Sequence, residues 1–160
     1  MRHLIAMMLM SVYGIALLSC GQRGGAGVEG VWMMTSVAVT APDTTATLDT
    51  PGTGILILHN GHYSQVWMDA NRRYSIPPSD LEKVDAYDTF DASAGTYTLA
   101  DSTLTLTPQV ARDPSAVGVP STTIIQLTGE TLVRRAERPD RNDPTKAMQW
   151  TSTYTRATPR

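Results

Sequence analysis

The sequence predicts an all-β fold, an antiparallel β-barrel of about eight strands with one short helix. Three observations predict it. The segment Gly30-Val31-Trp32 opens the first β-branched run, with a glycine for close backbone approach and a large ring that can plug a barrel end. Tight-turn dipeptides, Asn60-Gly61 above all, separate several short β-branched runs. The last run, residues 148–156, alternates between two distinct faces. Eight antiparallel strands close naturally into a small barrel without edges, and a two-sheet sandwich is the alternative.

Residues 1–19 are predicted to be a targeting segment. An apolar run at residues 4–18 follows Arg2 and His3, and it is shorter than the roughly 20 residues that span a membrane. It ends in Leu17-Leu18-Ser19-Cys20, which resembles the bacterial lipobox, where the cysteine is acylated and the chain is cleaved before it. The resemblance implies lipid attachment at Cys20 and an anchor in the bacterial cell envelope. An ordinary secretory peptide is the alternative.

The mature chain is expected to begin at Cys20, with a Gly-rich flexible tether at residues 20–27 and one barrel domain at residues 28–160. Gly21, where sorting signals have Asp, implies the outer membrane facing the periplasm if the cell has two membranes. Cys20 is the only cysteine, so no internal disulfide forms. Twelve of the thirteen Lys and Arg and all fifteen acidic residues follow residue 19, which leaves a net charge of −3. This charge and the lack of a basic stripe argue against nucleic acid as a partner.

The first half of the domain is predicted to contain three strands. Residues 31–40 form the first, and residues 41–53, rich in Pro, Gly and Thr, form a loop. Residues 54–59 and 62–69 then pair as a hairpin around a type I′ turn at Asn60-Gly61.

A helix is predicted to follow this hairpin. Ser79-Asp80-Leu81-Glu82 has the capping-box spacing that starts a helix. The apolar residues then recur every third position and form one stripe at helical spacing: Leu81, Val84, Tyr87 and Phe90. The acidic residues Asp85, Asp88 and Asp91 form the solvated face, and Gly95 stops the helix.

The rest of the chain is predicted to be β-structure. Residues 96–99 and 103–107 form a second hairpin around a turn at 100–102. Residues 122–128 and 132–137 form a third around Gly129-Glu130, between loops at 108–120 and 138–147. The final strand, 148–156, places Trp150, Tyr154 and Arg156 on one face.

This pattern resembles the bacterial lipocalin-like domains over residues 28–156. In lipocalins a G-x-W motif, here Gly30 to Trp32, opens the first strand, and a basic residue after the last strand, here Arg156, crosses over the tryptophan. The segment 54–63 and Gly95-Thr96-Tyr97 also match the bacterial group. Two features depart from it: Trp150 lies six residues before Arg156, and a helix interrupts the strands. The resemblance implies a barrel closed at one end by Gly30, Trp32 and Arg156.

Five residues are the candidates for lining a cavity that takes a small hydrophobic ligand: Tyr63, Gln65, Trp67, Trp150 and Tyr154. Aromatic walls with a few polar groups are typical of such sites. The alternative is that these side chains simply fill the barrel, because eight strands leave little more room than side chains need.

No catalytic residue, metal site or cofactor is predicted. The chain has no G-x-S-x-G motif, and His59 and His62 flank a turn without a third ligand in sight. We therefore expect a membrane-anchored binding protein for a small hydrophobic ligand, and not an enzyme. The alternative is an envelope interaction module with a solid barrel, whose protein partner the sequence leaves open.

Overall fold

A computed structural model of the chain describes residues 27–41, 44–48, 52–139, 143 and 145–158. These residues form nine strands, one α-helix and one 3₁₀ turn: β1 (Gly30–Ala41), β2 (Thr44–Leu48), β3 (Thr53–His59), β4 (His62–Met68), α1 (Asp80–Asp88), β5 (Phe90–Ala100), β6 (Thr103–Ala111), η1 (Pro114–Ala116), β7 (Ser121–Thr128), β8 (Thr131–Pro139) and β9 (Ala147–Arg156). The predicted signal peptide, Cys20 and most of the tether lie outside the described residues.

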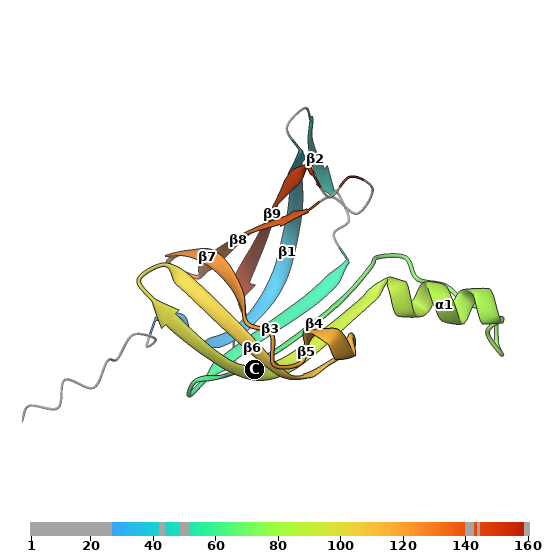
Figure 1. Cartoon of the computed structure of the whole chain (residues 1–160), viewed down its shortest axis with the longest axis horizontal. Helices are drawn as coiled ribbons and strands as arrows, with labels where there is room; N and C mark the ends of the chain where they lie inside the picture. The colour runs from blue at the N-terminus through green and yellow to red at the C-terminus, as the bar shows by residue number, and fades with distance from the viewer. Residues whose placement is uncertain (1–26, 42–43, 49–51, 140–142, 144, 159–160) are drawn as a thin grey trace, which may run out of the picture.

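Eight of the strands close into an antiparallel barrel (Figure 1). The neighbours follow the order β1-β3-β4-β5-β6-β7-β8-β9, and β9 pairs back with β1 from Trp32 opposite Arg156 to Thr40 opposite Gln149. Closure pairs both edges of every strand in the ring. The predicted fold class is confirmed, and the predicted positions of the three hairpins are correct.

The prediction that residues 41–53 form only a loop is wrong, because they contain β2. Strand β9 occupies one edge of β1, so β2 pairs with the other edge, from Val37 opposite Leu48 to Ala41 opposite Thr44. The same edge pairs with β3 further along. Strands β2 and β3 thus form one interrupted partner of β1. In the sequence β2 lies between two prolines, and its β-branched threonines favour an extended strand that can pair with β1.

Helix α1 begins where the capping box predicts, but it ends earlier than expected. The Ser79 hydroxyl accepts from the Glu82 backbone, and the Glu82 carboxylate accepts from the Ser79 backbone. The helix ends at Asp88 because the chain enters β5 at Phe90, which pairs with Met68 of β4. Gly95 therefore does not stop the helix; it lies buried within β5.

The apolar residues of α1 are largely exposed and do not form part of the core. The helix contains no buried residue, and Leu81 is 83% exposed. Figure 1 shows α1 projecting away from the barrel at the end of an arm, residues 69–89. Polar contacts hold this arm: Arg72 Nη2 donates to the Ala86 carbonyl at 2.7 Å, and the Tyr74 hydroxyl donates to Asp85 at 3.0 Å.

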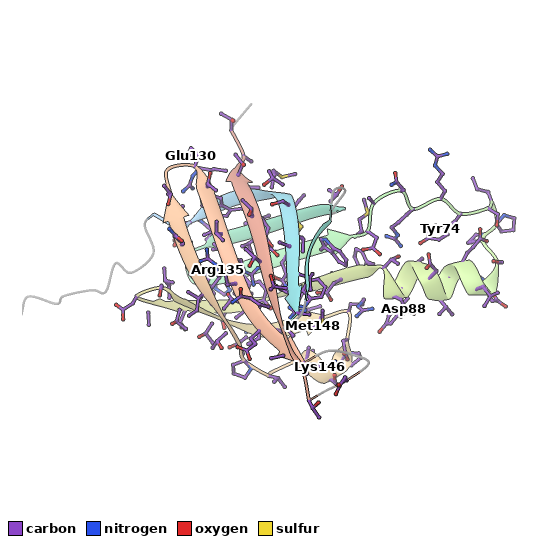
Figure 2. The ribbon with its side chains drawn as sticks, turned by 90° about the horizontal axis from the view of Figure 1, so that it is seen from above. Tyr74, Asp88, Glu130, Arg135, Lys146 and Met148 are labelled. Atoms are coloured by element: carbon purple, nitrogen blue, oxygen red, sulfur yellow. The ribbon has the colours of Figure 1, made fainter. Side chains whose placement is uncertain are left out.

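The two ends of the barrel differ. At the first, here named the turn end, short turns join β3 to β4, β5 to β6 and β7 to β8. At the other, named the loop end, lie the arm and the connections from β6 to β7 and from β8 to β9. Figure 2 shows Glu130 at the turn end and Lys146 at the loop end. The largest fully buried side chains among the described residues are Trp32, Leu56, Leu58, Leu104, Leu106 and Leu132.

Candidate ligand-binding site in the barrel

The turn end is closed by Trp32, which is completely buried. Its indole Nε1 donates to the carbonyl of Val28 at 2.8 Å, so the chain preceding β1 folds back over the ring. The Arg156 guanidinium carbon lies 4.2 Å from the centre of the Trp32 ring, a distance typical of cation–π contacts. The geometry expected from the lipocalin resemblance is therefore present.

Arg156 also ties two other segments to this end, the residues before β1 and the β7–β8 turn. Its guanidinium donates to the carbonyls of Glu29, at 2.5 Å, and Gly27, at 2.7 Å, and it forms an ion pair with Glu130 at 2.9 Å. Gly30 has φ 145°, and a Cβ there would collide with the Arg156 guanidinium. Glycine is thus required at position 30 for the Arg156 side chain to lie across Trp32.

Glu29 is a turn-end residue that sequence reasoning missed. Its Oε1 accepts from the Asn60 backbone and from the Tyr97 hydroxyl, each at 3.1 Å. Burial, together with this bond to Glu29, raises the pKa of Tyr97. The tyrosine therefore stays protonated and keeps donating its proton to the carboxylate across the neutral range.

The half of the interior next to the loop end, here named the loop half, is packed less tightly than the half next to the turn end, the turn half. Alternation along each strand from the buried residues places another set of side chains inward, and these are only half-buried: Gln65, Trp67, Ser93, Arg134, Trp150 and Ser152. Inward side chains that remain partly exposed indicate that solvent enters the barrel from the loop end.

A recess of about 240 Å³ lies in this half. Its lining comes from β4, β5, β6, the β6–β7 connection, the start of β7 and the end of β8: Tyr63, Gln65, Asp91, Ser93, Leu106, Pro108, Ala111, Asp113, Ala116, Val119, Ser121 and Arg138. The recess thus runs from the buried Tyr63 and Leu106 to the β6–β7 connection at the loop end.

The five candidate lining residues fall into two groups. Tyr63 and Gln65 line the recess, whereas Trp67, Trp150 and Tyr154 do not. Tyr154 pairs with Leu132 and is 5% exposed, so it belongs to the packed core. Trp67 and Trp150 lie on inward faces of the loop half, half-buried, next to Asp91 and Ala136 respectively.

Two polar contacts lie near the recess, one between neighbouring strands and one across the interior. The Tyr63 hydroxyl donates to Ser93 Oγ at 3.2 Å. Arg134 Nη1 donates to Gln65 Oε1, also at 3.2 Å, although β8 and β4 are not neighbours in the sheet. Sequence reasoning missed Arg134, and alternation from Leu132 along β8 was the signal that places it inward.

At the mouth, Arg112 joins the arm to the barrel. Its guanidinium carbon lies 4.5 Å from the centre of the Tyr87 ring, and Nη1 donates to the Tyr87 carbonyl at 2.7 Å. Its Nε lies 3.6 Å from Asp91 Oδ1. Tyr87 is thus the one member of the predicted apolar stripe whose ring packs on an arginine beside the recess.

His59 and His62 face each other across the β3–β4 turn, and His59 lies 3.8 Å from a Glu29 oxygen. Within the described ranges, no group of three or more His, Cys, Asp or Glu side chains is placed to hold a metal ion. A search of the same residues finds no helix with the length and apolar character needed to cross a membrane.

Comparison with solved structures finds a similarity to an uncharacterized protein from Bacteroides eggerthii DSM 20697. The TM-score is 0.42 at 11% sequence identity, over 81% of this chain and 98% of that one. No protein-family model matches the sequence, and no curated protein matches it. Membership of the lipocalin-like group therefore stays a prediction.

Proposed function

We propose that this protein is a lipid-anchored, lipocalin-like binding protein, not an enzyme, which takes a small hydrophobic ligand into the loop end of its barrel. One observation carries the proposal: inward side chains of the loop half stay half-exposed, and a recess of about 240 Å³ lies in the same half. A barrel packed solid along its length would bury these side chains as it buries Trp32 and Leu58.

The recess has the composition of a ligand site. Leu106, Pro108 and Val119 contribute apolar wall, while Tyr63 and Gln65 contribute a few polar groups. The volume lies just below the range of roughly 300–1,000 Å³ that is usual for ligand pockets, which favours a ligand no larger than a short alkyl chain. Octanol is a suitable neutral probe of this size.

Filling the recess should abolish binding and spare the fold. Ser93 lines the recess, so Ser93→Phe places a ring in the ligand's space. Thr98→Phe is the matched control, because Thr98 lies on the exposed outer face of the same strand. The mature chain carrying Cys20→Ser would be titrated with octanol while tryptophan emission is followed. We expect saturable binding that Ser93→Phe weakens at least tenfold and Thr98→Phe leaves unchanged; equal effects of the two rings would contradict the proposal.

The anchor is proposed from the lipobox, because Cys20 lies outside the described residues. The acyl chains would hold the domain in the cell envelope, at the outer membrane facing the periplasm if the cell has two membranes. Cys20→Ser should remove the acyl mass and release the protein from the membrane fraction. Membrane-bound, processed Cys20→Ser protein would refute the anchor.

The arm favours a second candidate, the envelope interaction module. Ile76 is 99% exposed and Leu81 is 83% exposed, which leaves two large apolar side chains uncovered at the tip of the arm. Exposed apolar clusters commonly mark protein contacts. A well-folded mature chain that binds no hydrophobic probe would make this module the better explanation.

A further inference from the structure

We propose that the ligand carries a carboxylate, which Arg134 receives inside the barrel. This inference rests on the proposed function and deepens it, because it names the chemical class of the ligand: a small apolar molecule with one anionic head group.

Arg134 points into the barrel from β8. It follows the fully buried Leu132 by two positions, and its hydrogen bond to Gln65 reaches across the interior to β4. Its cross-strand partners are Ile125 on β7 and Ser152 on β9. The positions that surround its base are therefore uncharged.

The charge of Arg134 lacks a counter-charge in the part of the chain that the structure describes. Nη1 donates to a neutral amide oxygen, Gln65 Oε1, and Nε is fully buried without a hydrogen-bond partner. No carboxylate there forms an ion pair with it. A guanidinium stays charged at every physiological pH, and burying it unpaired costs free energy.

Two other arginines at the ends of the barrel, Arg112 and Arg156, do have carboxylates. Arg112 lies 3.6 Å from Asp91, and Arg156 lies 2.9 Å from Glu130. Arg138 also lines the recess at the loop end, but its side chain is exposed to solvent, whereas the Nε of Arg134 is buried. An anion that enters the barrel would pair with Arg134 and remove the free-energy cost of burying its charge without a partner.

Gln65 connects this cation to the recess. Its side chain lines the recess and at the same time holds Nη1 of Arg134. A carboxylate is a stronger acceptor than an amide, and it matches the fork of a guanidinium with two parallel hydrogen bonds. An entering carboxylate would thus displace the Gln65 oxygen from Arg134, while Leu106 and Pro108 contact the apolar tail.

The acidic residues of the recess lie nearer its mouth. Asp91 is compensated by Arg112, and Asp113 accepts from the backbone and hydroxyl of Ser115 at 2.9 and 2.7 Å. These carboxylates are exposed or partnered, so they leave the unpaired Arg134 as the interior group that attracts an anion.

The test compares octanoate with octanol, two probes of the same chain length that differ in charge. The mature chain carrying Cys20→Ser would be titrated with each at neutral pH by tryptophan emission. We expect octanoate to bind at least tenfold more tightly than octanol, since a charge-assisted bidentate pair replaces a neutral hydrogen bond. Arg134→Met should remove this preference by weakening octanoate alone.

Arg135→Met is the matched control, because Arg135 is the next residue of β8 and its contact is with Gln126 on the outer face. It should keep the full preference for octanoate. Arg134→Lys, which keeps the charge without the fork, should reduce the preference only in part and serves if Arg134→Met does not fold. Saturable binding of both probes without a preference, or an unchanged preference in the Arg134 variants, would overturn this inference alone. No binding of either probe would refute the proposed function as well.

Discussion

Trp32→Ala is expected to lower the free energy of unfolding by about 3–5 kcal/mol, the usual cost of removing a buried aromatic side chain. Trp32 is completely buried at the turn end and packs with the core leucines. The substitution also leaves the Val28 carbonyl without its donor. Urea denaturation of the mature chain carrying Cys20→Ser measures the change.

Trp150→Ala is the matched control, since Trp150 is only half-buried and lies in the loop half. It should cost clearly less than Trp32→Ala. Arg156→Ala should also cost less, and the double variant should be less destabilised than the sum of the two single ones, because the guanidinium lies 4.2 Å from the ring. Additive losses would contradict an energetic coupling between the two groups.

Gly95→Ala is expected to destabilise the protein by about 1–3 kcal/mol, the range for overpacking a filled interior. Gly95 lies where the β5–β6 register shifts. A Cβ there would collide with the Thr107 carbonyl and come within 2.8 Å of the Gln109 nitrogen. These are backbone atoms of a paired strand, so they move only if the ladder is distorted.

Gly54→Ala separates this effect from the general cost of an added methyl. Gly54 is also a buried glycine in a strand, but its Cβ would meet the side chain of Met34, with the nearest atom at 2.9 Å. The flexible methionine can turn away. Denaturant unfolding should therefore show a smaller loss for Gly54→Ala; a larger loss than for Gly95→Ala would refute the explanation.

Local sequence signals predicted local features of the fold well. The Asn60-Gly61 turn and the capping box at Ser79 depend on residues within a few positions, and both are where the sequence indicates. The end of α1 depends on a distant contact, the pairing of Phe90 with Met68, which outweighs the helical stripe. Strand β2 likewise depends on a distant contact: its threonines favour an extended strand, but only the available edge of β1 gives that strand a partner.

The candidate site was predictable where the alternation of residues sufficed. Alternation placed Tyr63 and Gln65 on the inner face, and both line the recess. It also placed Tyr154 inward, but whether an inward side chain fills the core or faces a recess depends on its height in the barrel. Tyr154 lies beside Leu132 near the turn end and is buried there. Arg134 was missed because a charged residue in a strand is usually assigned to the solvent face.

The most direct test of the central claim is a nuclear magnetic resonance titration of the mature chain, carrying Cys20→Ser, with octanol. We expect saturable chemical-shift changes at the residues of the recess, such as Gln65, Ser93 and Leu106. The turn end around Leu58 and the exposed face of α1 should remain unchanged. Saturable changes confined to α1, or none anywhere in a well-folded chain, would contradict a ligand site inside the barrel.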